Sequence, residues 1–242
     1  MIMNPSMAVM PSISALVPVY NEIAIVSESV REIHDFMQSL GCTFEILIIE
    51  SGSSDGTAEA CDRLASQFSE VVVFHEGQRN GFGAALRLGF AKAASDLIWV
   101  VPVDLPYSLS FLQAGLRQIV DCDAILSVRR SDDRSLYRRL QSRIYTWLCS
   151  LLLRQPGYSP NAAFKLYRRL VVLDLPLRSN GWFIDTEIAC RLRQRNCRLG
   201  TVAIDTVERT SGQSTVTTLD SWQMFKQLLA FRKVLIDENK NR

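Results

Sequence analysis

Short apolar strands that stop at polar turns, each followed by a helical pattern, constrain the fold of this chain more than any other feature. The first run, 13–18, opens into Tyr20-Asn21-Glu22, and the second, 45–49, opens into Glu50-Ser51-Gly52-Ser53. The alternation continues with strand patterns at 71–74, 97–101 and 124–128 and helical patterns at 27–40, 57–68, 84–93 and 110–120. It predicts βαβ units in a mostly parallel α/β sheet, with the carboxyl ends of the strands along one edge. Ligands of open α/β sheets bind at that edge.

From residue 129 onward the order of the patterns changes. It runs through a helix at 137–153, a loop at 156–161, a short strand at 163–167, a helix at 185–195, a strand at 199–205 and a helix at 220–236. We expect Ser27 and Asp220 to cap the helices that they begin, because their side-chain oxygens can accept from free backbone N–H groups. With 242 residues and 48% hydrophobic content, the chain is expected to form one domain with a frayed tail at 237–242.

Composition excludes several classes of protein. No run of about 18 apolar residues is present, which excludes a membrane-spanning helix. The N-terminus lacks the basic and apolar segments of a secretory signal, and the six cysteines form no C-x-x-C pair. Both features are typical of a cytoplasmic protein with reduced thiols. With only two histidines, His34 and His75, a histidine-rich metal centre is excluded, and both are expected to be structural or solvated.

The net charge of +2 hides an uneven distribution. Residues 1–120 carry a net charge of −7, and residues 121–242 carry +9. This split suggests that the second half meets an anionic partner, although solvated helix faces explain most single arginines equally well. Nucleic acid is not the expected partner, because the sequence has no aromatic-interleaved strand platform and no binding motif.

Several motifs recur in a characteristic order. They are 17–22 (VPVYNE), 50–57 (ESGSSDGT), 79–89 (RNGFGAALRLG), 103–105 (VDL), 163–169 (AFKLYRR), 181–187 (GWFIDTE) and 209–214 (RTSGQS). Their order and spacing resemble family-2 glycosyltransferases, especially polyprenol-phosphate sugar synthases of the dolichol-phosphate-mannose type. The resemblance implies a single domain of the glycosyltransferase A-type fold. Within it, a nucleotide-sugar-binding half at about 13–128 would precede an acceptor-side half at about 129–236.

The resemblance assigns the first turn to the nucleotide, through Pro18, Tyr20 and Glu22. A tyrosine ring can stack on a base and a carboxylate can accept from base or ribose donors. An ordinary strand-terminating turn is the alternative interpretation. The glycine pair Gly81 and Gly83 does not complete a dinucleotide fingerprint, because Leu86 stands at the third glycine position, so a Rossmann dehydrogenase is not expected.

Three further assignments to the nucleotide come from the second turn, where the chain has Glu50-Ser51-Gly52 and relatives have Asp-Asp-Gly. Glu50 keeps a carboxylate that can read the base, while Ser51 loses a charge. The resemblance also implies that Arg79, which precedes the glycine-rich turn, can reach phosphate.

The segment Pro102-Val103-Asp104 lies where related enzymes carry an Asp-X-Asp metal motif, beside the nucleotide. Asp104 matches the second aspartate, whereas Pro102 supplies no ligand. Because Mg²⁺ often takes only one or two carboxylates plus substrate phosphates, Asp104 could hold Mg²⁺ or Mn²⁺ weakly through the donor diphosphate. The alternatives are leaving-group stabilisation by arginines without a metal, or loss of catalysis.

On the acceptor side, Asp185 and then Glu187 are the candidates for a general base toward an acceptor hydroxyl. Complementing the dipole of the helix that they begin is the alternative role. The Arg-x-x-Gly-x-Ser segment, with Arg209, Gly212 and Ser214, resembles the part of these synthases that closes over phosphate.

Arginines also lie near an apolar run at 144–153. Arg129 and Arg139 are candidates for binding the acceptor phosphate, with Arg130, Arg138 and Arg143 as neighbours. Such a basic face beside Trp147 can lie in an anionic membrane interface. A helix packed into the core with an arginine-coated outer face is the alternative.

The expected function is therefore inverting sugar transfer from a nucleotide-diphosphate sugar to a polyprenyl phosphate or a glycan, at the cytoplasmic face of a membrane. A phosphate acceptor is already anionic near neutral pH and needs no strong base. Because the acidic positions of the family are lost at Ser51, Pro102 and Ser159, the alternative is a catalytically impaired homologue that binds nucleotide sugars or acts as a scaffold. A nucleotidyltransferase is disfavoured, since no glycine-rich signature follows the first strand.

Overall fold

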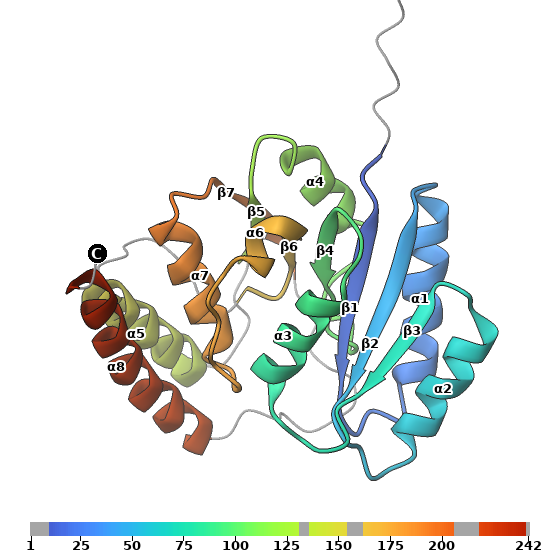
Figure 1. Cartoon of the computed structure of the whole chain (residues 1–242), viewed down its shortest axis with the longest axis horizontal. Helices are drawn as coiled ribbons and strands as arrows, with labels where there is room; N and C mark the ends of the chain where they lie inside the picture. The colour runs from blue at the N-terminus through green and yellow to red at the C-terminus, as the bar shows by residue number, and fades with distance from the viewer. Residues whose placement is uncertain (1–9, 131–135, 154–161, 206–217, 241–242) are drawn as a thin grey trace, which may run out of the picture.

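Seven strands form one sheet, flanked by helices on both faces (Figure 1). The structure is a computed structural model that describes residues 10–130, 136–153, 162–205 and 218–240. The strands are β1 (Ile13–Val19), β2 (Phe44–Glu50), β3 (Val71–His75), β4 (Leu97–Val100), β5 (Ala124–Arg129), β6 (Lys165–Arg168) and β7 (Leu199–Ile204). The helices are α1 (Val26–Ser39), α2 (Thr57–Gln67), α3 (Phe82–Lys92), α4 (Phe111–Gln118), α5 (Leu136–Leu153), α6 (Arg169–Leu173), α7 (Ile184–Gln194) and α8 (Thr218–Lys240).

The strand order is β3-β2-β1-β4-β6-β5-β7, and all neighbours are parallel except those that involve β6. The predicted mostly parallel sheet is confirmed, and the five strands up to Arg129 end at the same edge, as predicted; β6, which follows the change of pattern after residue 129, runs in the opposite direction. The physical reason lies in α5, which packs against α8 instead of crossing the sheet. Since α5 does not return the chain to the opposite edge, β6 enters from the carboxyl edge of β4 and β5 and runs antiparallel to both.

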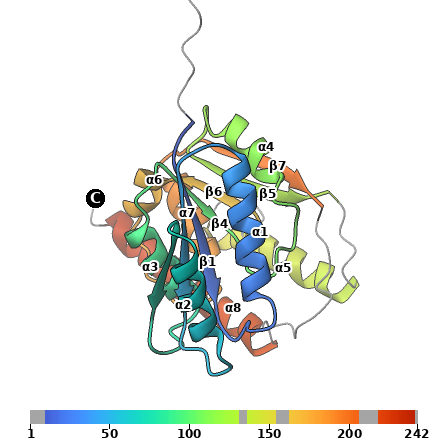
Figure 2. The same cartoon turned by 90° about the vertical axis from the view of Figure 1, so that its right-hand side faces the viewer.

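Alternate residues of the central strands are buried on opposite faces of the sheet, as the two-residue period of a strand requires. One face is covered by α1, α2 and α4, and the other by α3, α6 and α7, as the view in Figure 2 helps to follow. These two layers explain why the strands read as continuous apolar runs rather than alternating ones.

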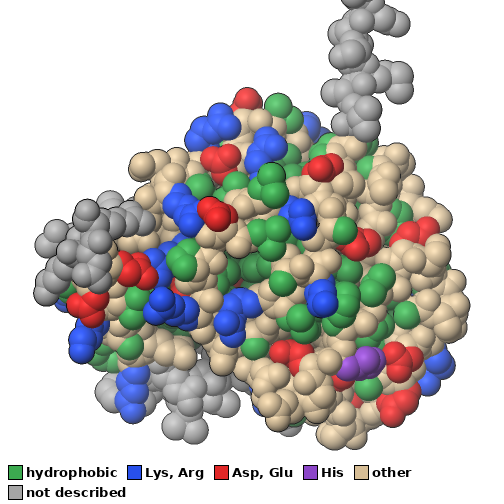
Figure 3. Space-filling view, viewed as in Figure 1, with side chains coloured by type: hydrophobic (Ala, Val, Ile, Leu, Met, Phe, Trp, Pro, Cys, Tyr) green, Lys and Arg blue, Asp and Glu red, His purple; other side chains and the backbone are tan. Residues whose placement is uncertain are grey.

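The uneven charge of the sequence is visible on the surface. In Figure 3, several Lys and Arg side chains lie on the left-hand part, which holds α7 and α8, together with some acidic side chains, while the right-hand part, around β2, β3 and α2, carries several acidic side chains.

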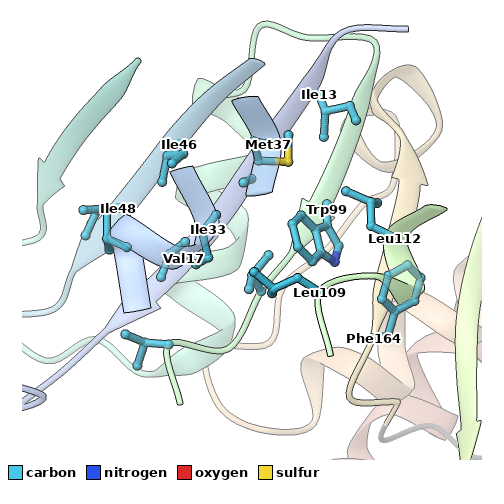
Figure 4. Packing of buried hydrophobic residues seen from close by; sticks show 14 of the residues in the cluster. Ile13, Val17, Ile33, Met37, Ile46, Ile48, Trp99, Leu109, Leu112 and Phe164 are labelled. Atoms are coloured by element: carbon cyan, nitrogen blue, oxygen red, sulfur yellow. The ribbon is translucent and has the colours of Figure 1, made fainter. Parts of the chain in front are cut away.

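The largest core cluster is built around Trp99 of β4, which is fully buried. Its ring lies 6.2 Å from that of Phe36 on α1 and 6.4 Å from that of Phe164, measured between ring centres, and Figure 4 shows the packing around it. None of the six cysteines is in a disulfide, and burial raises the pKa of Cys61 to about 12. This core fixes the strands whose ends form the candidate site.

Two local predictions are wrong. Ser27 lies inside α1, which begins at Val26 without a side-chain cap, and Asp220 lies inside α8. The predicted frayed tail at 237–242 stays a prediction, and α8 runs to Lys240. Its last turns are anchored by Glu238, whose Oε1 accepts from Arg191 Nη2 at 2.9 Å.

Candidate functional site

The turns after β1 and β2 lie side by side at the carboxyl edge, where Val19 is in register with Glu50. Backbone N–H of Asn21 donates to Ser53 Oγ at 3.0 Å, and backbone N–H of Ser54 donates to Asn21 Oδ1 at 2.9 Å. Asn21 adopts φ 53°, a left-handed conformation that asparagine tolerates. Hydrogen bonds therefore join the two predicted nucleotide turns into one unit.

Glu50 is buried, and both of its carboxylate oxygens are engaged within the protein. Oε1 accepts from backbone N–H of Ser53 at 2.5 Å, and Oε2 lies 3.0 Å from His75 Nδ1. His75 Nε2 in turn lies 3.0 Å from Asp62 Oδ1. Burial alone raises the pKa of Glu50, but the hydrogen bonds from His75 and Ser53 lower it below its usual value. The carboxylate thus holds the turn, and base recognition by Glu50 stays a prediction.

The loop after β3 packs against the same turn. Ser51 Oγ donates to Glu76 Oε2 at 2.6 Å, and Gly52 has φ 70°. A Cβ at Gly52 would lie 2.6 Å from Cα of Gln78, so only glycine permits this approach. The loop brings the guanidinium of Arg79 to 4.3 Å from the centre of the Tyr20 ring. Two residues that the sequence assigned separately to the nucleotide therefore meet.

The glycine-rich turn at 81–83 connects the nucleotide side to the segment before α7. Backbone N–H of Gly83 donates to the carbonyl of Asn180 at 2.7 Å, which satisfies a free donor at the start of α3. Phe82 stacks on Trp182, with ring centres 4.6 Å apart. The start of α3 is therefore occupied by a protein carbonyl.

Asp104 follows β4 in a turn in which backbone N–H of Leu105 donates to the carbonyl of Pro102 at 3.1 Å. Asp104 is half-buried, and the Val103 side chain is part of the core. Within the described ranges, no group of three His, Cys, Asp or Glu residues could hold a metal ion. The residues present fit a metal only when substrate phosphates complete its ligands.

Asp185 and Glu187 have different environments in the first turns of α7. Asp185 Oδ2 accepts from Lys165 Nζ at 2.8 Å, and both side chains are buried. Glu187 is also buried, and its carboxylate accepts from backbone N–H of Arg178 at 3.1 Å and of Ser179 at 2.8 Å. An acceptor hydroxyl would have to displace these bonds, so Asp185 is the stronger candidate for a ligand contact.

Sequence reasoning missed Lys165. The residue lies within the 163–169 motif, where the apolar pattern predicts only a short strand. A lysine between apolar strand residues is itself a signal, because a buried ammonium group needs a partner.

The predicted phosphate residues are only partly covered by the structure. Arg129 ends β5 and is exposed, next to Arg130, whose Nη1 lies 3.1 Å from Asp205 Oδ2. Arg139 is half-buried on α5. Arg209, Gly212, Ser214 and Ser159, and the side chain of Arg138, lie outside the described residues.

Comparison with known proteins decides the family. The family described as Glycosyl transferase family 2 matches residues 14–175. The chain belongs to glycosyl transferase family 2. This family-2 member is 29% identical over 203 residues to Glycosyltransferase AglD of Haloferax volcanii, which covers 80% of this chain and 32% of the relative. It is also 29% identical over 164 residues to an undecaprenyl-phosphate 4-deoxy-4-formamido-L-arabinose transferase of Salmonella paratyphi B, which covers 66% of this chain and 50% of the relative.

The chain thus spans about a third to a half of the length of these curated relatives. Among solved structures, glucosyl-3-phosphoglycerate synthase of Mycobacterium tuberculosis, in a complex with Mn²⁺ and UDP, has a TM-score of 0.69 and 18% identity, covering 95% of this chain and 84% of that one. The mannosyltransferase PcManGT of Pyrobaculum calidifontis, with GDP-Man and Mn²⁺, has a TM-score of 0.63 and 19% identity, covering 86% and 59%. The predicted glycosyltransferase A-type fold is confirmed.

Proposed function

We propose that this family-2 glycosyltransferase moves a sugar, with inversion, from a nucleotide-diphosphate sugar to a polyprenyl phosphate. The observation that carries the proposal is the contact between Tyr20 and Arg79 above the joined turns. It brings a tyrosine ring, one face of which the Arg79 guanidinium covers, and a cation for a diphosphate to the ligand-binding edge of the sheet. Support for the acceptor comes from the Salmonella relative, whose name specifies undecaprenyl phosphate.

In this proposal, residues 13–128 bind the donor and residues 129–236 bind the acceptor. The donor contacts are Pro18, Tyr20, Glu22, Glu50, Ser51, Gly52, Arg79, Val103 and Asp104. The acceptor or phosphate contacts are Arg129, Arg139, Arg209, Gly212 and Ser214. An acceptor phosphate oxygen attacks the anomeric carbon as the bond to the nucleoside diphosphate breaks, and Arg79 stabilises the departing negative charge.

We assign a metal only a minor role in this site. Mg²⁺ or Mn²⁺, when bound, would neutralise charge on the diphosphate, held by Asp104 and the phosphate oxygens. Solved structures of the same fold that contain Mn²⁺ support this assignment. Because Pro102 offers no second carboxylate, we expect the dependence on metal to be weak.

Contact with a membrane surface is the other part of the proposal. No helix among the described residues is long and apolar enough to cross a membrane. On α5, however, Leu140, Ile144, Trp147 and Leu151 are 57%, 49%, 61% and 58% exposed and follow the spacing of one helix face. The opposite face, with Leu148, Cys149 and Leu152, packs against α8 and α7. One face of α5 is therefore packed against other helices, and the other face is apolar and exposed. The helix thus combines a core-packed face with a face that could meet a membrane, which the sequence had offered as alternatives.

The free face, which we call the α5 stripe (Leu140, Ile144, Trp147 and Leu151), suits an anionic lipid surface. Arg143 is exposed between Leu140 and Trp147, and α5 contains no acidic residue. Cations next to an apolar stripe with a tryptophan are typical of helices that lie in a membrane interface.

A two-step experiment tests the proposed function. A thermal-shift panel with UDP, GDP, UDP-glucose and GDP-mannose, with and without Mn²⁺, should show a ligand that stabilises the protein; at 100 times its dissociation constant the gain is about 2.7 kcal/mol. The donor identified is then assayed for transfer to undecaprenyl phosphate. Stabilisation without transfer to any acceptor would favour the alternative of a protein that binds nucleotide sugars or acts as a scaffold. The loss of the second carboxylate beside Asp104 is consistent with that alternative.

A further inference from the structure

Two carboxylates hold the ring of His75 through its two nitrogens. Nδ1 lies 3.0 Å from Oε2 of Glu50, and Nε2 lies 3.0 Å from Oδ1 of Asp62 on α2. An ionised carboxylate oxygen only accepts hydrogen bonds, so each ring nitrogen must donate one, and only the imidazolium carries a proton on both. The arrangement therefore fits protonated His75, and a neutral ring would lose one of the two bonds.

His75 connects α2 to the two predicted nucleotide turns. It ends β3 in register with Glu50. The other oxygen of Glu50, Oε1, accepts from backbone N–H of Ser53 at 2.5 Å, and Ser53 Oγ accepts from backbone N–H of Asn21 at 3.0 Å. Continuous hydrogen bonds thus run from Asp62 through His75 and Glu50 to both turns.

The burial of Glu50 makes its partner important. The side chain of Glu50 is 3% exposed, whereas those of His75 and Asp62 are 39% and 64% exposed. A buried carboxylate is costly without a charged or hydrogen-bonded partner. If His75 lost a proton, the neutral ring would keep its one N–H for Glu50, because Asp62 can turn into water and Glu50 cannot. Glu50 would then lose its countercharge, and the bond from the ring to α2 would break.

The same proton changes the charge of the turns. The segments 17–22, 50–57 and 75–80 contain one arginine, Arg79, against four acidic residues, Glu22, Glu50, Asp55 and Glu76. Cys61 of α2, close to Glu50, stays a neutral thiol, because burial raises its pKa to about 12. A nucleoside diphosphate is an anion, so these carboxylates repel it. A positive charge on His75 offsets part of that repulsion.

We propose that His75 is a positioning residue for nucleotide binding: as an imidazolium held by Asp62, it fixes the Glu50 carboxylate behind the donor turns and offsets their negative charge. This inference rests on the proposed function, because its ligand is the nucleoside diphosphate part of the donor. It gives a specific role to a histidine that the sequence predicted to be structural or solvated.

Nucleotide affinity as a function of pH gives the first test. The dissociation constants of the parent for UDP and for GDP, measured by isothermal titration from pH 6 to pH 9, should include a rise of about two- to tenfold as pH passes through the pKa of His75. Hydrogen bonds to Glu50 and Asp62 raise that pKa, so the affinity is full below it and is lost above it. His75→Asn can still donate to Glu50 but does not titrate, so its profile should lack this rise.

Asp62 provides a sharper comparison. Asp62→Asn removes one of the two carboxylates that favour the imidazolium, so the loss of affinity should move to lower pH. The matched control is Asp35→Asn on α1, another exposed aspartate, whose Oδ1 lies 3.2 Å from Nδ1 of the other histidine, His34. Its profile should match that of the parent. The nucleotide itself titrates alike in every experiment, so differences between the variants report on the protein. A purely structural role for Asp62 would change the melting temperature without moving the profile.

Linkage gives an independent readout. If protonation of His75 strengthens nucleotide binding, then bound UDP or GDP must raise the pKa of His75 by the same free energy. The chain has only two histidines, so NMR titration of the ring signals follows His75 directly, and His75→Asn assigns its signal.

Three results would overturn the inference while leaving the proposed function intact. They are a pH profile in His75→Asn identical to that of the parent, an unshifted profile in Asp62→Asn, and a His75 titration that is the same with and without saturating nucleotide. If the parent binds neither UDP nor GDP, the proposed function fails and the inference fails with it.

Discussion

The guanidinium of Arg79 lies 4.3 Å from the centre of the Tyr20 ring, which joins the loop after β3 to the end of β1. The contact depends on Gly52, because a side chain there would collide with the backbone of Gln78, next to Arg79. A cation over an aromatic face contributes about 0.5–1 kcal/mol at an exposed site. Its main effect here is to keep an arginine at the edge where a diphosphate would bind.

Replacing Arg79 by alanine should weaken binding of UDP or GDP, whichever the parent binds, by about tenfold or more, the scale of one hydrogen bond to a charged group. The melting temperature should fall by no more than about 2–4 °C, because Arg79 is exposed and its contact with Tyr20 contributes only about 0.5–1 kcal/mol. Arg117→Ala is the matched control, since this exposed arginine lies in the last turn of α4, toward the opposite edge of the sheet. Equal dissociation constants for Arg79→Ala and the parent would refute the phosphate role.

The Glu50–His75–Asp62 chain predicts a pH-dependent contribution to stability. Hydrogen bonds to Glu50 and Asp62 raise the pKa of His75 above its usual value. This contribution is therefore full below the unfolded-state pKa of about 6.5, and it is lost as pH rises through the higher folded-state value. His75→Gln should lower the melting temperature more at pH 6 than at pH 9. A difference between parent and variant that is constant across this range would contradict the coupling.

Most of the fold could be predicted because it depends on local patterns. The apolar runs at 13–18 and 45–49 match β1 and β2 to within a residue or two, because β-branched segments between polar turns favour strands. The direction of β6 could not be predicted from local patterns. It follows α5, which packs against α8, a helix far along the chain. The same limit applies to the site: the engagement of Glu50 depends on His75, 25 residues later.

Gly83 should be sensitive to a single added methyl group. A Cβ there would lie 2.5 Å from the carbonyl oxygen of Ser179, a backbone atom that cannot rotate away. Gly83→Ala should destabilise the protein by about 1–3 kcal/mol in urea unfolding, the range for forced overpacking. Gly181→Ala is the control from the same contact, because its nearest atom lies 3.9 Å away at the end of the Gln227 side chain. Similar losses in both variants would show that the close approach does not matter.

Restoring one carboxylate should strengthen the metal-dependent binding of nucleotide at this site. Pro102→Asp should tighten Mn²⁺-dependent binding of UDP or GDP, because a second carboxylate would join Asp104 in the turn after β4. Asp104→Asn should remove any Mn²⁺-dependent gain while leaving the melting temperature of the ligand-free protein unchanged. Titrations in Mn²⁺ and in EDTA measure both effects. Tight Mn²⁺-dependent binding by the parent itself would show that Pro102 does not weaken the site.

The α5 stripe predicts binding to anionic membranes. Ile144→Ser/Leu151→Ser should reduce flotation of the protein with phosphatidylserine-containing liposomes by about tenfold or more in partition coefficient, since burying one such side chain contributes roughly 1.5–3 kcal/mol. Binding of the parent should also fall with rising salt, because exposed arginines are screened at distances beyond about 10 Å in 0.1 M salt. The matched control is Val120→Ser/Leu170→Ser, which removes two side chains that are 69% and 75% exposed but lie away from α5. If the control pair reduces flotation as strongly as the stripe pair, binding reflects general surface hydrophobicity, and the assignment to α5 is wrong.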